Sequence, residues 1–153
     1  MESENEKPKV KVIAKNRRAS HDYHLMDRLE AGMVLEGTEV KSLRDGRATL
    51  SDCYARVEDN EIFVHNLDIP PYTHGTHNNH EPKRPRKLLL HKKEIKKLRT
   101  IVTERGLTII PTRIYFKSGY AKLELSIAKG KSHGDKRHDL KKKDHEREMA
   151  RYR

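Results

Sequence analysis

Polar and apolar residues alternate along much of the chain, which is the pattern of half-buried β-strands. The alternation is cleanest over residues 120–128, where the odd-numbered positions are apolar and predicted to face the core, and Lys122, Glu124 and Ser126 are predicted to face solvent. Similar patterns predict strands at residues 10–13, 33–43, 53–58, 62–67 and 108–116. Asp59-Asn60 separates two of these strands, so they are expected to pair as a hairpin.

Glycine and proline interrupt these patterns in three places. Gly37 is expected to mark a bulge or a close backbone approach inside the strand at 33–43. Pro111 indicates an edge strand or a bulge, because proline has no N–H to donate to a neighbouring strand. Residues 70–86 contain four prolines. They are predicted to form a long loop that is either functional or disordered.

Residues 88–105 carry apolar side chains at helical spacing, and Gly106 follows where a C-terminal cap is expected. Residues 23–31 fit a strand and a helix equally well. About six short strands with a few short helices predict a mainly β fold. We expect a small, closed, antiparallel β-barrel resembling an oligonucleotide-binding fold.

The chain of 153 residues is expected to hold one domain with an extension at each end. Residues 1–9 are polar and predicted to be a disordered arm. Residues 10–128 are predicted to form the barrel domain. Residues 129–153 hold ten Lys and Arg against five acids and few apolar residues. This basic tail is expected to be disordered when free and helical once a polyanion cancels its charge.

Lysine and arginine number 34 and acidic residues 23, which gives a formal net charge of +11. An anionic partner is therefore expected, either nucleic acid or an acidic membrane surface. The membrane interpretation is weak, because the chain has no Trp, two Phe and no apolar run of the roughly 18 residues that a span needs. Nucleic acid is the favoured partner.

Cys53 is the one cysteine, so no internal disulfide is possible. The first residues also lack the apolar segment of a secretory signal. Both observations favour the reducing cytoplasm.

Two basic clusters are candidates for contact with nucleic acid. Residues 16–21 place Arg17 and Arg18 beside an amide, a hydroxyl and the imidazole of His21. Guanidinium groups match phosphate oxygens and guanine edges. Residues 83–87 carry four positive charges around a proline. A solvated turn or loop is the alternative for each cluster.

His74, His77 and His80 are spaced by three, which could indicate a metal site. Surface histidines in an RNA-facing loop are the preferred interpretation, because structural zinc sites usually contain paired cysteines. No metal and no cofactor are expected. Asp22 and Glu30 could be acids of a metal-dependent nuclease, but nothing gathers further carboxylates near them. The chain is therefore predicted not to be an enzyme.

Five segments resemble the SsrA-binding protein (small protein B) family of bacterial trans-translation. They are NRRA at 16–19, EAG at 30–32, GTEVKSLR at 37–44, RKLLL at 86–90, and GK at 130–131 with DKR at 135–137. The resemblance covers about residues 10–145. It implies binding to the tRNA-like domain of transfer-messenger RNA, and delivery of that RNA to stalled ribosomes with elongation factor Tu and GTP. It also implies that the tail enters the decoding centre of the small subunit and the empty mRNA path. A monomer is expected.

The resemblance also implies roles for particular residues. Asn16, Glu30 and Leu89 align with RNA-binding residues of the family, although Leu89 could instead be a core residue. The expected basic neighbours of these three are Arg17, Arg18, His21, Lys41, Arg44, Arg84, Arg86 and Lys87. The expected ribosome-binding residues of the tail are Gly130, Lys131, Asp135, Lys136 and Arg137. Ser132 departs from the family, which commonly has lysine there. A ribosomal or initiation-type protein that binds rRNA permanently is the alternative function.

Overall fold

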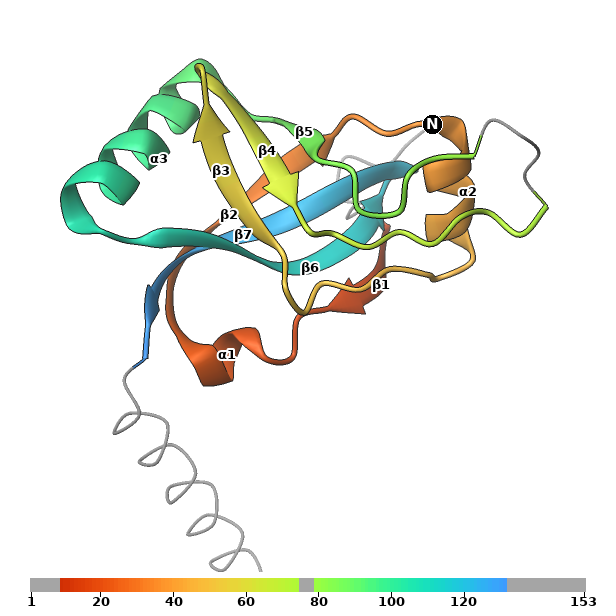
Figure 1. Ribbon diagram of the computed structural model, residues 1–153, viewed down its shortest axis with the longest axis horizontal. Coiled ribbons are helices and arrows are strands. Elements are labelled where there is room, and N and C mark those ends of the chain that lie inside the picture. Colours follow the sequence, from red (N-terminus) through yellow and green to blue (C-terminus); the bar gives the residue numbers. More distant parts are fainter. Residues whose placement is uncertain (1–8, 75–78, 132–153) are drawn as a thin grey trace, which may run out of the picture.

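The computed structural model describes residues 9–74 and 79–131 (Figure 1). Within these residues the strands are β1 (Val10–Lys15), β2 (Tyr23–Met33), β3 (Tyr54–Glu58), β4 (Glu61–His65), β5 (Arg86–Leu89), β6 (Thr108–Lys117) and β7 (Tyr120–Gly130). The helices are α1 (Ala19–Asp22), α2 (Gly37–Arg44) and α3 (Lys92–Arg105). Among the described helices, none is long and apolar enough to cross a membrane.

The strands form one antiparallel sheet whose order is β1-β6-β3-β4-β5-β2-β7. An additional pairing between β6 and β7 joins the two parts of this order, so that six strands close into a barrel-like ring. β1 lies outside the ring and pairs with β6. The predicted mainly β, antiparallel fold is confirmed.

One main cluster of buried side chains fills the interior of the sheet, including Ile62, Leu88, Ile114 and Leu123. A second, small cluster joins Ala19, Ile110 and Ala128, where α1 lies against the sheet. The second half of β7 is buried on both faces, and this includes Glu124 and Ser126. The prediction that these two residues face solvent was wrong, because Glu124 is enclosed by its ion pairs with Arg28 and Arg113, and the Ser126 hydroxyl donates to the Met26 carbonyl of β2.

The turns follow the predictions closely. β3 and β4 form the expected hairpin, with Asp59 and Asn60 at φ 46° and 66°. Gly106 ends α3 in the left-handed conformation that favours glycine. Pro111 lies beside a register shift in β6, as expected for a bulge, although β6 is an interior strand and not an edge. Residues 23–31 belong to strand β2, not a helix.

The predicted strand at 33–43 was wrong, because residues 37–44 form α2. Gly37 is the first helical residue and not a bulge. The residues that α2 buries are Glu39, Ser42 and Leu43, at helical spacing. Two of these three are polar, so the helical repeat is hidden from any analysis of apolar residues. The Glu36 backbone donates to the Glu39 carboxylate at 2.7 Å, which forms half of a capping box.

β5 was missed altogether. The predicted loop ended at Arg86 and the predicted helix began at Leu88, whereas residues 86–89 form β5 and α3 begins at Lys92. β5 pairs with β4 over three residues and with β2 over two. The strand is short and follows a proline-rich segment, so its pattern has too few residues to indicate a strand.

Candidate nucleic-acid interface

The outward side of β1, β6, β7, β2 and β5 forms a continuous surface, called here the outer face. Directly opposed residues of antiparallel strands share a face of the sheet. The pairing register therefore places Leu89, Gly32, Lys122, Tyr115 and Val12 in one row across the five strands. The next row along β2, β7 and β6 contains Glu30, Glu124 and Arg113. Glu30 and Leu89, predicted from separate segments of the sequence, thus lie on the same face.

Glu30 is held by two neighbours on β6. The Tyr115 hydroxyl donates a hydrogen bond to its carboxylate at 2.5 Å, and Lys117 Nζ lies 3.3 Å away. The hydrogen bond from Tyr115, with the bond and charge of Lys117, lowers the pKa of Glu30 below its ordinary value although burial opposes this. Burial and the bond to Glu30 raise the pKa of Tyr115, so the phenol stays protonated as the donor. Glu30 is therefore an oriented, ionised acceptor that can accept from a guanine edge or hold an arginine.

Leu89 is 53% exposed, which excludes the alternative that it is a core residue. It lies opposite Gly32 of β2. A Cβ on Gly32 would come within 3.2 Å of Leu89 Cβ. The missing side chain at Gly32 therefore gives Leu89 room to lie on the outer face, where it offers an apolar contact to a base or a sugar.

Asn16, Arg17 and Arg18 lie between β1 and α1. The segment was predicted to be a connector, and the structure shows that its end winds into a short helix. Asn16 Nδ2 donates to the Pro111 carbonyl at 3.1 Å, which fixes this segment beside the bulge of β6. Arg17 and Arg18 are exposed. Arg18 lies 4.0 Å from Asp22, and His21 Nδ1 lies 3.0 Å from the same carboxylate.

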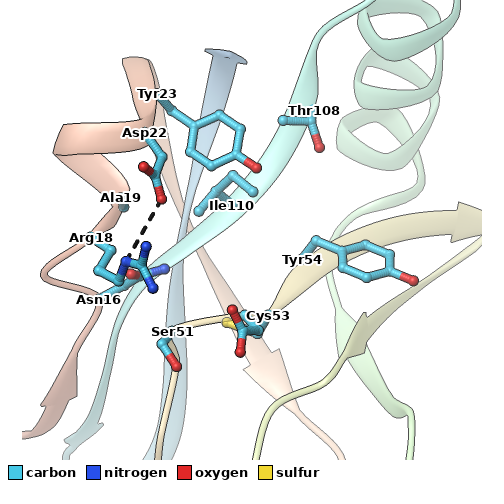
Figure 2. Close-up of a pocket in the computed structure, with 11 residues that line it drawn as sticks. Asn16, Arg18, Ala19, Asp22, Tyr23, Ser51, Cys53, Tyr54, Thr108 and Ile110 are labelled. Atoms are coloured by element: carbon cyan, nitrogen blue, oxygen red, sulfur yellow. Dashed lines mark ion pairs between the residues drawn. The ribbon is translucent and has the colours of Figure 1, made fainter. Parts of the chain in front are cut away.

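Two hollows meet at Asn16. The first has a volume of about 280 Å³ and is lined by Arg18 and Asp22 on one side and by Ser51, Cys53 and Tyr54 on the other (Figure 2). Cys53 is unreactive there, because burial raises the pKa of its thiol to about 12.

The second hollow, of about 480 Å³, is called here the arginine hollow. Four cationic side chains line it, namely Lys15, Arg17, Arg28 and Arg113. Glu124 also lines it and forms ion pairs with Arg113 and, at 3.4 Å, with Arg28. Glu124 thus orients two guanidinium groups without neutralising all four cations. This arrangement suits the phosphates of a nucleic-acid backbone.

Sequence reasoning missed Lys15, Arg28, Arg113, Lys117 and Lys122 as parts of this surface. Each occupies an outward position of a strand. Once the inward positions of β1, β2, β6 and β7 are known, these residues follow, but their pairing register is not visible in the sequence.

The other predicted basic residues are distributed differently. Lys41 and Arg44 are exposed on α2, away from α1 (Figure 1). Lys41 Nζ lies 5.6 Å from the centre of the Tyr72 ring. Lys87 is paired with Glu61 at 3.1 Å. The structure therefore does not bring these three residues into the arginine hollow.

The prediction that Arg86 contacts RNA needs correction. Arg86 is fully buried and paired with Glu39, and it donates to the Leu67 carbonyl at 2.6 Å and the Pro82 carbonyl at 2.9 Å. Arg84 forms an ion pair with the same Glu39 carboxylate. Burial raises the pKa of the Glu39 carboxyl, but bonds from Arg84, the Glu36 amide and Arg86 outweigh it, so the pKa lies below its ordinary value. Both arginines therefore join α2 to the proline-rich segment.

The expectation of surface histidines also fails for His80, which is buried. Its Nε2 lies 2.7 Å from the Ile69 carbonyl and its Nδ1 lies 2.9 Å from the Thr38 hydroxyl. A carbonyl only accepts, so Nε2 donates. His74 is exposed beside Tyr72, and His77 lies outside the described residues. In residues 9–74 and 79–131, no three His, Cys, Asp or Glu side chains are grouped to hold a metal ion.

The beginning of the predicted tail is part of the sheet. Gly130 ends β7 opposite Tyr23, and the Lys131 amide donates to the Asp22 carbonyl at 2.9 Å. Lys131 Nζ donates to the Ser20 carbonyl at 2.9 Å. Asp135, Lys136 and Arg137, with Ser132, lie outside the described residues.

The barrel-like sheet and its cationic outer face place the chain in the class of small β-proteins that bind nucleic acids. The family model of the SmpB protein matches residues 13–153. The chain therefore belongs to the SmpB family.

Several relatives agree with this assignment. The SsrA-binding protein of Geobacter sulfurreducens is 57% identical over 140 residues, which is 92% of each chain. The SsrA-binding protein of Bacillus cytotoxicus is 54% identical over 141 residues, covering 92% of this chain and 91% of the relative. A solved structure described as "tmRNA-SmpB: a journey to the center of the bacterial ribosome" matches with a TM-score of 0.66 and 49% identity, over 78% of this chain and 85% of the other.

Proposed function

We propose that this protein binds transfer-messenger RNA (SsrA RNA) and acts with it on stalled ribosomes in trans-translation. The observation that carries the proposal is the outer face. It combines an oriented carboxylate, an exposed leucine and a four-cation hollow, formed by adjacent strands and the segment that follows β1. The family membership and the solved relative on the ribosome support it.

The outer face supplies two kinds of contact. Lys15, Arg17, Arg28 and Arg113 bind phosphates, which positions the RNA and makes its affinity depend on salt. Glu30 and Leu89 contact bases or sugars, which adds selectivity. Binding alone accounts for the function, so the protein is an RNA-binding factor and not an enzyme.

The finer proposals follow the family resemblance. The RNA element bound is the tRNA-like domain, and delivery involves elongation factor Tu with GTP. The protein acts as a monomer in the cytoplasm. Residues 129–153, with a net charge of +5, contact rRNA at the decoding centre and along the empty mRNA path. The alternative function, a ribosomal or initiation-type rRNA-binding protein, would sediment with all ribosomes instead of stalled ones, and the family membership argues against it.

The first test is binding to the tRNA-like domain across a salt series. We expect the double variant Arg17→Ala, Arg18→Ala to lower the slope of log affinity against log salt concentration by about 1 to 2. With fewer phosphate contacts, binding releases fewer counterions from the RNA. Truncation after Lys131 should leave the affinity for the tRNA-like domain within about twofold but abolish tagging on stalled ribosomes. The reason is that the removed residues are proposed to bind ribosomal RNA and not the tRNA-like domain. An unchanged slope would remove the arginines from the interface. Loss of RNA binding on truncation would contradict the division of roles.

A further inference from the structure

The chain enters the described structure beside the outer face. The Lys9 carbonyl accepts a hydrogen bond from the Ser118 amide at 3.1 Å. Val10, Lys117 and Tyr120 follow as the last row of the outer face, since they are directly opposed on β1, β6 and β7. The residues that precede Lys9 are therefore attached at the end of this face.

The attached segment is acidic at regular intervals. Glu2, Glu4 and Glu6 alternate with other residues, and residues 2–6 are called here the acidic arm. The arm lies outside the described residues. In an extended chain, residues two apart point to the same side and repeat about every 6.8 Å, while Lys7 would point to the other side. The three carboxylates can therefore meet one surface together.

The outer face offers cations at the same repeat. Lys117 lies in the last row, Lys122 in the second row, and Arg113 and Lys15 in the third. Outward residues along one strand are also separated by two positions, or about 6.8 Å. The spacing of the carboxylates on the arm thus matches the spacing of the rows.

The acidic arm is long enough to cross these rows. From Ser118, which is bonded to Lys9, the row of Arg113 is five residues away along β6, or about 17 Å. Glu2 is seven residues from Lys9, which an extended chain spans as about 23 Å. The lysines of α3 lie on the opposite side of the molecule from β1 (Figure 1). The outer face is therefore the cationic surface within easy reach of the arm.

We propose that the acidic arm binds the outer face in the free protein and competes there with the phosphates of RNA. This autoinhibitory contact rests on the proposed function, in which the outer face is the RNA surface. Attachment to β1 keeps the carboxylates at a high effective concentration. Exposed ion pairs are individually weak, so an RNA with many phosphates displaces the arm. The apparent RNA affinity is then reduced in proportion to the fraction of chains whose outer face is free.

The first test detects the contact without RNA. Cys53 is the one cysteine of the chain, and it is buried, so a spin label can be attached selectively to a Ser3→Cys variant. We expect the label to broaden the backbone amide NMR signals of Lys117 and Lys122. High salt should remove the broadening, because it screens exposed charges. Exchange of the three arm glutamates for glutamine should remove it as well.

The second test measures binding of the isolated tRNA-like domain to the full chain. The triple variant Glu2→Gln, Glu4→Gln, Glu6→Gln should bind about two- to fivefold more tightly than the unmodified chain at low salt, because no arm has to be displaced. The gain should vanish at high salt, where the unmodified arm is already released.

Three controls accompany these tests. Asp45→Asn, Glu81→Gln and Glu104→Gln remove the same charge from exposed positions outside the outer face, and should neither reproduce the gain in affinity nor remove the broadening. Aspartate at the three arm positions keeps the charge and should keep both effects. An equal mixture of spin-labelled chains and isotope-labelled chains should show no broadening, since the contact is within one chain.

Several results would overturn the proposal. They are outer-face signals that are not broadened, broadening that survives the glutamine exchange or appears on α3 instead, broadening between chains in the mixture, an unchanged RNA affinity, and an equal gain in the charge-matched control. The last would mean that only net charge matters. If the unmodified chain did not bind the tRNA-like domain, the proposed function would fail, whereas the RNA-free measurement would still decide whether the arm binds the outer face.

Discussion

At the scale of single residues, Glu30 is the most unusual part of the RNA surface, because a carboxylate repels phosphates. The contribution of Glu30 to RNA binding depends on the orientation of its carboxylate, which Tyr115 and Lys117 fix. A carboxylate held in this way rejects backbone contacts and accepts hydrogen bonds from base edges or arginine. We infer that Tyr115 is a positioning residue.

Tyr115→Phe should therefore raise the pKa of Glu30 toward its ordinary value and weaken binding of the tRNA-like domain by about threefold to tenfold, which corresponds to roughly one hydrogen bond. NMR titration of the Glu30 carboxyl and a binding series would measure both effects. The matched control is Tyr120→Phe, the same change on a ring that is 73% exposed. Loss of affinity with an unmoved Glu30 titration would exclude the positioning role.

Leu88 and Leu89 provide a direct comparison of two neighbours with opposite orientations. Leu88 is 1% exposed and Leu89 is 53% exposed. Leu88→Ala should reduce the free energy of unfolding by about 2 to 5 kcal/mol through loss of core packing. Leu89→Ala should change it by less than about 1 kcal/mol but weaken RNA binding. Urea denaturation and a binding assay on both variants would test this, and a Leu89 variant with full affinity would remove Leu89 from the interface.

At the scale of elements, the buried Glu39–Arg86 pair connects α2 to β5, and Lys87 next to it forms an exposed pair with Glu61. Arg86→Met should lower the free energy of unfolding by about 3 kcal/mol or more, because it leaves a buried carboxylate and two carbonyls with fewer partners. Lys87→Met should cost at most about 1 kcal/mol. Equal effects in urea denaturation would mean that the buried pair has no special structural role.

The same pair predicts a dependence of stability on acid. The folded pKa of Glu39 lies below its ordinary value of 4.5, so the ionised carboxylate stabilises the fold above that pH. This contribution is lost as the pH falls through the folded pKa. Glu39→Gln should be less stable at neutral pH and should show a shallower loss of stability below about pH 4.5. If the free energy of unfolding of the unmodified chain and of Glu39→Gln changed in parallel with pH, Glu39 would not be the source of the acid dependence.

The elements also show which features the sequence makes visible. Strands with one buried face, such as β3 and β4, are visible in the sequence as alternating apolar and polar residues. α2 does not, because it buries Glu39 and Ser42 and keeps them satisfied by partners more than 25 residues away, at Arg86 and Pro70. Arg86 was expected at the RNA surface because its long-range partner, Glu39, could not be recognised in the sequence. Its charge is visible in the sequence, but its buried partner is not.

At the scale of the whole molecule, the basic composition and the β-rich pattern were sufficient to predict the class of fold and an anionic partner. The outer face was only partly predicted. Asn16, Glu30 and Leu89 were identified through resemblance, whereas Arg28 and Arg113 come together only when β2, β7 and β6 pair in their particular register. Surfaces built across strands depend on long-range pairing, which a single sequence does not specify.

The contacts of Lys131 also have a mechanical consequence. β7 is flanked by β2 and β6 along most of its length, and its hydrogen bonds run roughly perpendicular to the strand. Traction applied to the chain after Lys131 along the strand would load these bonds in shear, all at once, instead of unzipping them singly. The bonds from Lys131 to the Asp22 and Ser20 carbonyls extend this set and would share the load. The barrel could thus withstand a pull on its C-terminal end while the outer face stayed bound to RNA.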